Sequence, residues 1–266
     1  MACTSHIPVL LVHGIASRDE STSGSKLWGR IPDALRAAGH PVFFGDQDAW
    51  GTVETNAEQL AKTIESVAAQ SPDGQVVIVA HSKGGLDSLA ACRLPGIAEK
   101  VRALITLSSP HQGMAFCDWL LRSRVIIPRI AAPVVNAKAK LSGDANPDSY
   151  GALQALGARS RGDAEGEPRS ETVPLISVGF EAPQPKGLVG SIVQKLDGPN
   201  DGLVPLSATN AGNWKVARIL DGTPFLHTDC LDDRTRNIPL ELDGTHHNSI
   251  ADLIRHLVSA AAEVNR

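Results

Sequence analysis

Continuous apolar runs alternate with helix-like periodicity along the first half of the chain. Between residues 53 and 68 the apolar positions recur at steps of three and four, which is typical of a helix. The run VVIVA at 76–80 shows no alternation with polar residues and predicts a strand buried on both faces. Further strands are expected at 7–12, 41–45 and 101–107, and a further helix at 84–92. This order of strands and helices predicts an α/β fold with a parallel sheet covered by helices on both faces.

The regular pattern breaks after Pro110. Residues 114–160 are helix-prone but irregular, and residues 157–172 are polar and Gly-rich, which indicates a surface loop. Strand character returns at 173–179 and within 214–220, and a terminal helix is expected over 249–264. We therefore expect a single domain over 1–266, with 114–172 as a helical lid or cap insertion.

The composition excludes several classes of protein. In 266 residues, 42% hydrophobic and 20% charged residues are enough for a sizeable core, which excludes a disordered chain and a disulfide-dense miniprotein. A net charge of -4 gives no electrostatic case for nucleic acid. The 4 Cys form no CxxC pair, which excludes zinc-finger and redox motifs. With neither a signal-peptide pattern nor an 18-residue apolar run, we expect no membrane span and a cytoplasmic location, or secretion if this is a mature form.

The most informative segment is VVIVAHSKGGLDSLAA, in which a buried strand leads directly into a tight turn and a helix. Ala80-His81-Ser82-Lys83-Gly84 follows the nucleophile-elbow pattern G-x-S-x-G with Ala at the first position. The residues two before and two after the serine must be small for the helix to approach the strand. The pattern predicts that Ser82 is a nucleophile above the carboxyl end of the sheet. The alternative is a chance match in a Ser- and Gly-rich loop.

Two backbone groups are candidates for an oxyanion hole. Lys83 opens the helix after the serine, so its N–H is free to face developing negative charge. The loop after the first strand, VLLVHGIAS, would aim the N–H of Ile15 at the same point, with Gly14 allowing a close approach of the backbone. Alone, His13-Gly14 is equally consistent with an ordinary glycine at the end of a strand.

A serine nucleophile needs a histidine base, and in this architecture the order along the chain is nucleophile, acid, histidine. Of the nine histidines, those late in the chain on a loop after the last strand fit that order. The segment 243–250 (DGTHHNSI) is expected to be such a loop. We predict His247 as the base, with His246 as the alternative. Both could instead be solvated loop residues, and a two-histidine metal site lacks a third ligand.

The acid is predicted to be Asp201, in the segment Pro199-Asn200-Asp201-Gly202-Leu203-Val204-Pro205. An Asx-Gly turn would fix this residue and leave its carboxylate free to accept from the histidine. The same residues are also common in simple turns. Three other residues compete by position: Asp221, Asp229 and Asp243.

These motifs together resemble the bacterial triacylglycerol lipases of the α/β-hydrolase fold. VLLVHGI, AHSKGGLDS, TLSSPHQG and NDGLVP occur in order, so the resemblance covers residues 7 to about 120, then 173–205 and the final histidine loop. It implies an α/β-hydrolase fold and a serine esterase or lipase acting on acylglycerols or other hydrophobic acyl esters. Ser82, Asp201 and His247 match the family's catalytic residues, and Ile15 and Lys83 match its oxyanion donors.

The sequence departs from that family where calcium would bind. Calcium-binding members carry an acidic residue two positions after the catalytic histidine, and here that position is Ser249, or Asn248 if His246 is the base. We therefore expect no metal and no cofactor. The cysteines give no match to the family's disulfide either.

The insertion determines which substrates the site would accept. Residues 118–137 (DWLLRSRVIIPRIAAPVVNA) combine apolar residues with three arginines, which is consistent with a mobile lid that contacts lipid or with a static cap. Either would give an apolar roof that favours hydrophobic esters. Three alternatives remain: a polyester (polyhydroxyalkanoate) depolymerase, an acyl thioesterase, and a non-catalytic binding protein. The sequence leaves the oligomeric state open.

Overall fold

The computed structural model describes residues 7–19, 27–122, 128–157, 173–182, 187–220, 222, 224–232 and 237–263. These residues form one eight-stranded sheet in the order β2-β1-β3-β4-β5-β6-β7-β8. The strands from β2 to β6 pair in parallel, and β7 and β8 extend the sheet as an antiparallel hairpin. The strands are β1(Val9–Val12), β2(Val42–Phe44), β3(Val76–His81), β4(Val101–Leu107), β5(Leu175–Glu181), β6(Asn213–Ile219), β7(Leu240–Leu242) and β8(Thr245–His247).

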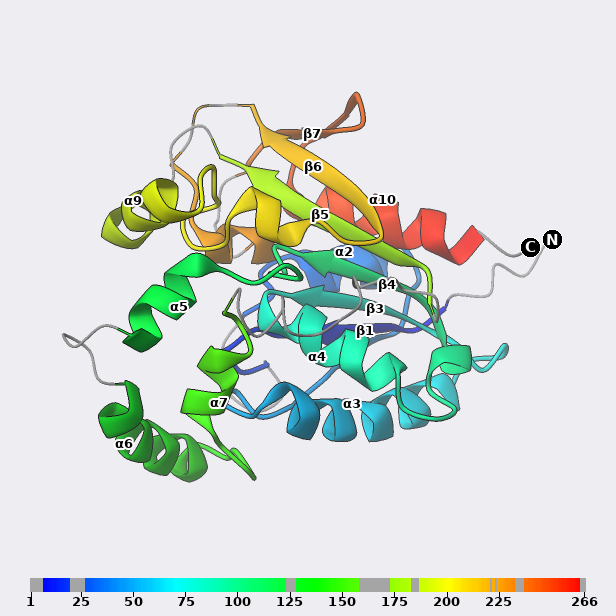
Figure 1. The fold of residues 1–266 in the computed structure, drawn as a ribbon. Coiled ribbons are helices and arrows are strands. Elements are labelled where there is room, and N and C mark those ends of the chain that lie inside the picture. The colour runs from blue at the N-terminus through cyan, green and yellow to red at the C-terminus, as the bar shows by residue number, and fades with distance from the viewer. Residues whose placement is uncertain are drawn as a thin grey trace.

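Helices cover both faces of this sheet (Figure 1). One face carries α2(Ile31–Ala37) and α10(Ile250–Glu263), and the other carries α3(Val53–Ala68) and α4(Lys83–Cys92). Successive residues of a strand point to opposite faces, so Val9 and Leu11 join the first core while Leu10 and Val12 join the second. The expected α/β-hydrolase architecture of a mostly parallel sheet between two helical layers is confirmed.

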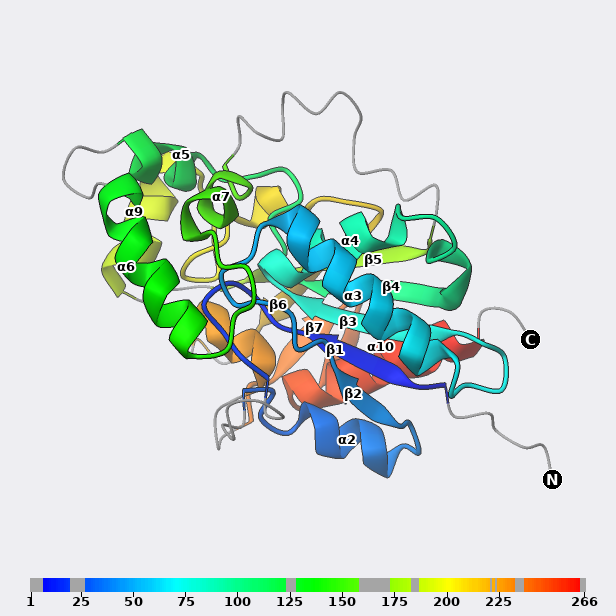
Figure 2. The same ribbon diagram turned by 90° about the horizontal axis from the view of Figure 1, so that it is seen from below.

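A group of helices lies beyond the carboxyl ends of the strands, on the left in both views (Figures 1 and 2). Between β4 and β5 the chain forms α5(Ala115–Arg122), α6(Pro128–Leu141) and α7(Ser149–Gln154), and α9(Gly187–Leu196) follows β5. Within the predicted insertion at 114–172, the described residues 114–122 and 128–157 thus contain three helices, and a lid or cap role for them stays a prediction. The expected surface loop lies outside the described residues from 158 onward, as do Val125, Ile126 and Ile127.

Three carboxylates hold this group of helices in place, two by linking it to the loop before α3 and one by linking α9 to α5, and each accepts hydrogen bonds from two consecutive backbone N–H groups. Asp48, in the loop before α3, accepts from residues 145 and 146 at 2.8 and 2.7 Å. Asp144, after α6, accepts from residues 49 and 50 at 3.1 and 3.0 Å, and pairs with Arg18. Asp197, after α9, accepts from residues 115 and 116 at the start of α5, both at 3.0 Å. We call these three the latch carboxylates.

Most predicted elements lie within two residues of the observed ones, and α3 and β4 match at both ends. The pattern of apolar positions gave no prediction of α2, α9 or the β7–β8 hairpin. The short 3-10 helices Ala98–Lys100, Leu206–Thr209 and His227–Leu231, here η1, η2 and η3, were not predicted either. Within the described residues, no helix has both the length and the apolar character needed to cross a bilayer.

Candidate active site

Ser82 stands on a sharp turn between β3 and α4. Its backbone has φ 55° and ψ -129°, a conformation that L-residues rarely adopt and that costs on the order of 1–3 kcal/mol. Backbone hydrogen bonds hold the turn, since Ser82 N–H donates to the Leu107 carbonyl at 2.9 Å and Gly85 N–H donates to the Ser82 carbonyl at 3.1 Å. The geometry is that of a strained strand-to-helix elbow with the serine at its tip.

Gly84 is required because the end of β1 passes directly over it. A Cβ at this position would lie 2.3 Å from the carbonyl oxygen of His13 and 2.7 Å from that of Val12. The neighbour that demands a small residue here is therefore the backbone that leads into the His13-Gly14 loop. Contact between the elbow and this loop brings the backbones of Ile15 and Lys83 to the same end of the sheet.

The loop after β1 is held close to the serine. A Cβ on Gly14 would lie 2.9 Å from the Ser82 Cβ, well inside normal carbon contact. The His13 ring fixes the loop from the other side, with Nδ1 2.8 Å from the Gly14 carbonyl and Nε2 3.0 Å from the Gln47 carbonyl. The amide of Gln47 donates back to the His13 carbonyl at 2.8 Å. The loop is thus ordered beside Ser82 by contacts on both of its sides.

Asp201 is buried in an Asx turn, and Gly202 takes φ +104°. Its Oδ1 accepts from the N–H groups of Leu203 at 3.0 Å and Val204 at 2.8 Å. Burial raises the pKa of Asp201, but the attraction of His227 and hydrogen bonds from His227, Ser108 and Val204 outweigh it. The net effect holds the pKa of this carboxyl below its ordinary value, so the group is ionised at neutral pH.

The remaining oxygen of Asp201 contacts His227. Oδ2 lies 2.8 Å from Nδ1 of His227, which begins η3. Because a carboxylate only accepts, Nδ1 carries the proton and Nε2 of the neutral ring has a free lone pair. Nε2 is buried and has no hydrogen-bond partner among the described residues. The His227 ring also packs against the ring of His81, the residue directly before Ser82, with centroids 4.4 Å apart.

His247 does not meet Asp201, so the expected pairing is corrected to His227. Instead of a loop, 245–247 is strand β8, because Asp243 and Gly244 both take positive φ in a two-residue hairpin turn. Five strand spacings separate β8 from β3, or about 24 Å. His247 faces Asp252 at 3.8 Å, and burial holds the pKa of His247 below its ordinary value. The alternative, His246, is exposed and lies 3.5 Å from Glu241.

The sequence did contain a signal for His227. His227 follows β6, the last parallel strand. An acidic residue, Asp229, stands two positions after it, whereas the residue two positions after His247 is Ser249. Asp229, a competitor for the role of acid, accepts instead from Leu226 N–H at 2.6 Å and caps η3. Asp243 pairs with Lys215, and Asp221 lies outside the described residues.

A buried ion pair lies in α4, the helix that follows the elbow. The ammonium of Lys83 lies 2.7 and 2.9 Å from the two oxygens of Asp87, and both side chains are almost fully buried. Asn56 of α3 donates to the same carboxylate at 2.8 Å. Burial raises the pKa of Asp87 above its ordinary value, against the opposing effects of Lys83 and Asn56. The pair lies within the first turns of α4, and the hydrogen bond from Asn56 ties it to α3.

The site has an apolar surround. We call the helices α5, α6, α7 and α9 together the cap. A cluster of buried side chains from α4, the cap and the segment after Asp201 packs against the partly buried Ile15 and Leu203. Its members include Leu86, Met114, Phe116, Val193 and Val204.

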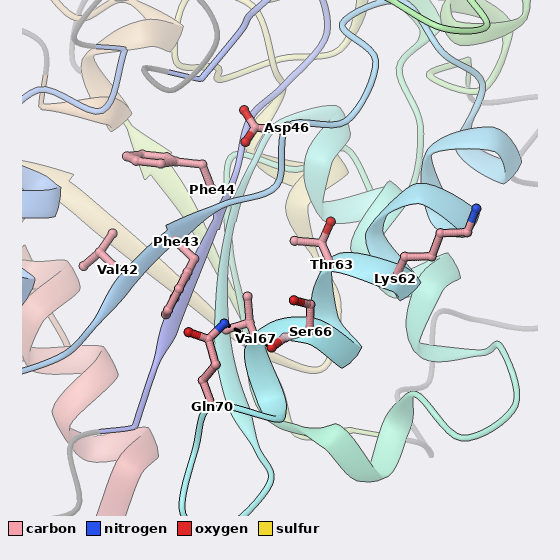
Figure 3. A pocket seen from close by; sticks show the side chains of 9 residues that line it. All are labelled: Val42, Phe43, Phe44, Asp46, Lys62, Thr63, Ser66, Val67 and Gln70. Atoms are coloured by element: carbon pink, nitrogen blue, oxygen red, sulfur yellow. Dashed lines mark hydrogen bonds between the residues drawn. The ribbon is translucent and has the colours of Figure 1, made fainter.

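A groove of about 470 Å³ elsewhere, between β2 and α3, is lined by residues such as Phe43 and Lys62 and does not include Ser82, Asp201 or His227 (Figure 3).

No group of three or more His, Cys, Asp or Glu side chains in the described part of the chain is arranged to hold a metal ion. The cysteines at 92, 117 and 230 are buried free thiols. Burial raises the pKa of Cys92 and of Cys117 to about 12, so neither is a nucleophile at neutral pH. The side chains that the structure gathers at the carboxyl end of the sheet include those of Ser82, His227 and Asp201.

Comparisons with known proteins point to esterases and lipases. Residues 49–123 match the PGAP1-like alpha/beta domain family. A triacylglycerol lipase of Pseudarthrobacter phenanthrenivorans is 28% identical over 116 residues, which cover 42% of this chain and 36% of that protein. A probable esterase of Oryza sativa subsp. indica is 31% identical over 127 residues, which cover 42% of this chain and 45% of that protein. The matched region thus spans less than half the length of these curated relatives.

The fold is also that of a solved lipase. Lipase 1 from Pelosinus fermentans superposes with a TM-score of 0.68 at 14% identity, covering 98% of this chain and 100% of that one. At this identity the likeness concerns the fold. The chain therefore has the fold of this lipase, and part of it is similar in sequence to triacylglycerol lipases and esterases.

Proposed function

We propose that the chain is a serine carboxylic ester hydrolase in which Ser82 is the nucleophile, His227 the base and Asp201 the acid. The observation that carries the proposal is the 2.8 Å contact between Asp201 and Nδ1 of His227, whose ring packs against that of His81, the residue before Ser82. This contact leaves Nε2 of His227 free to accept a proton. His247 has no part in this assignment.

The reaction follows from these roles. His227 Nε2 takes the Ser82 hydroxyl proton as the oxygen attacks the ester carbonyl, and Asp201 stabilises the imidazolium that forms. The N–H groups of Ile15 and Lys83 stabilise the tetrahedral oxyanion, and loss of one such donor costs about 2.7–4 kcal/mol of barrier. The imidazolium protonates the departing alcohol and leaves an acyl group on Ser82. Water, deprotonated by the same histidine, then releases the acid and restores the serine.

The apolar surround of the site supports hydrophobic acyl esters as the substrate class. Ile15, a proposed oxyanion donor, and Leu203, two positions after Asp201, both pack on the apolar cluster that surrounds the site. Such walls favour an acyl chain over a sugar or a charged peptide. The names of the relatives, triacylglycerol lipase and probable esterase, are in keeping with this class.

Contact with a lipid surface would follow from the outer side of the cap. α5, α6 and α9 lie together on one side of the molecule (Figure 2), and large apolar side chains on them are exposed. On α6, Ile130 and Val134 are 69% and 73% exposed, while the residues it buries are alanines. The charged residues of α6 and α9 are all basic. An apolar face flanked by cations is suited to the surface of a lipid aggregate.

Two histidine variants test the assignment against its closest rival. We expect His227→Ala to lower kcat/KM for p-nitrophenyl esters by about 10⁴-fold or more, whereas His247→Ala stays near wild type. Ser82→Ala should abolish hydrolysis and labelling by a fluorophosphonate probe while the fold is retained. Loss of activity in His247→Ala with normal activity in His227→Ala would overturn the assignment. A wild-type chain that the probe does not label would favour a non-catalytic binding protein.

The substrate class is tested separately with matched substrates. Hydrolysis of p-nitrophenyl esters of short and long acyl chains, compared with an emulsified triacylglycerol, should show a preference for long chains. A greater rate on an acyl thioester or on polyhydroxyalkanoate would redirect the substrate assignment and leave the proposed chemistry of Ser82 in place.

A further inference from the structure

His81, the residue before the proposed nucleophile, makes contacts that the mechanism above does not use. Its side chain is buried at the junction of three segments. Nε2 lies 3.2 Å from the backbone carbonyl of His227, the ring packs on the His227 ring, and Nδ1 faces Gly14, where a Cβ would lie 3.3 Å away. One side chain thus contacts the loop of the proposed base and lies beside the loop of the proposed oxyanion donor Ile15.

The hydrogen bond fixes which nitrogen of His81 carries the proton. A carbonyl oxygen only accepts, so Nε2 must be the donor. Nδ1 is buried and has no partner among the described residues, so nothing there would stabilise a second proton. Burial, followed by the repulsion of His227, holds the pKa of His81 well below its ordinary value of 6.5. The ring is therefore neutral across the pH range in which an imidazole base works.

A neutral ring in this position has two effects on its neighbour. The donor from Nε2 fixes the backbone carbonyl of His227 and with it the starting point of η3. The rings of His81 and His227 have centroids 4.4 Å apart and planes tilted by 35°, a separation within the range over which the faces of Trp, Tyr and Phe attract a cation. That attraction exists only once His227 is charged, so it favours the state reached when the base has taken the serine proton.

We infer that His81 is a positioning residue for His227, holding its backbone by the Nε2 hydrogen bond and stabilising its imidazolium form through the adjacent ring. The inference rests on the proposed function, in which His227 is the base. Besides His227, the titratable groups that act on His81 are Asp201 and His13. Those that adjoin His227 are Asp201 and His81, with Asp229 and Cys230 following it in η3.

Two variants separate the two contributions. His81→Gln keeps an amide donor for the His227 carbonyl but removes the ring, and His81→Phe keeps a ring but removes the donor. We expect the NMR titration midpoint of the His227 ring in His81→Gln to move to lower pH by about 0.4–1.5 units, the range that a cation–π contact produces. In His81→Phe the midpoint should stay near wild type, while kcat falls and KM is little changed.

The titration also separates this inference from the proposed function, because it reads the His227 ring whether or not the chain hydrolyses esters. An unchanged midpoint in His81→Gln, or an equal shift in both variants, would overturn the inference even if both variants lost activity. Thermal unfolding of each variant serves as the folding check. If His81→Phe does not fold, comparison of His81→Gln with wild type still decides the electrostatic part.

Discussion

The buried pair of Lys83 and Asp87 offers a prediction whose size can be worked out from its geometry. At 2.7 Å and an effective dielectric constant of about 20, the attraction is about 6 kcal/mol, most of which offsets the cost of burying two charges. Replacing Lys83 by Met keeps the packing volume of the stem and leaves Asp87 buried with only the Asn56 amide as a side-chain partner. Breaking such a pair typically costs about 3–5 kcal/mol.

The assay is urea unfolding at two pH values, with Lys83→Met compared against the double variant Lys83→Met/Asp87→Leu. At pH 8 we expect the single variant to lose about 3–5 kcal/mol, and the double variant to recover most of it because no unpaired charge remains. The pKa of Asp87 is already raised by burial, and removal of Lys83 raises it further. The cost of the single variant should therefore shrink as the pH falls and Asp87 takes up a proton in the folded state.

Because the backbone N–H of Lys83 is the proposed oxyanion donor, both variants keep it. Fluorophosphonate labelling of Ser82 in the double variant should therefore proceed at a rate close to that of the wild type. The reasoning would be refuted if Lys83→Met lost less than about 1 kcal/mol at pH 8, or if the double variant were no more stable than the single one.

Three further predictions follow from contacts around the site. Gly84→Ala should cost about 1–3 kcal/mol of stability and about 10²-fold in kcat, because a methyl group 2.3 Å from the His13 carbonyl must push the oxyanion loop away; an unchanged urea midpoint would contradict it. Asp144→Asn should speed hydrogen exchange at the amides of residues 49 and 50, measured by NMR, while exchange in β3 is unaffected. Because folding lowers the pKa of His81, its contribution to the free energy of unfolding is complete above pH 6.5 and is lost as the pH falls below that value. In urea unfolding measured against pH, the resulting slope of up to about 1.4 kcal/mol per pH unit should be absent in His81→Gln.

The parts of the fold that the sequence predicts well are those whose environment is uniform. β3 and β4 are buried along nearly their whole lengths, so their apolar runs are unbroken, and α3 repeats its apolar positions faithfully because one face packs on the sheet. Ser82 could be located because the elbow imposes small residues at fixed spacings around it. Such constraints act between residues close in the chain, so they can be recognised in the amino-acid sequence.

The histidine could not be located in the same way, because its place depends on strand order. Asp243-Gly244 is a hairpin signal. When this signal is not taken into account, residues 245–247 resemble a loop that leads into a helix. Once the hairpin forms, His247 lies at the far edge of the sheet, and the last loop after a parallel strand becomes the one that holds His227. Which histidine meets Asp201 is decided by pairing between strands distant in the chain.

Two of the latch carboxylates, Asp48 and Asp144, limit how this cap could be replaced by the cap of another protein. A graft joined at the ends of the insertion would remove residues 145 and 146 and leave Asp48 with a buried negative charge and two donors fewer. The backbone N–H groups of residues 49 and 50 would also lose their acceptor, because Asp144 belongs to the segment that is replaced. A workable chimera would therefore have to carry the segment around residues 46–52 with the cap, so the unit that can be transplanted is discontinuous in sequence.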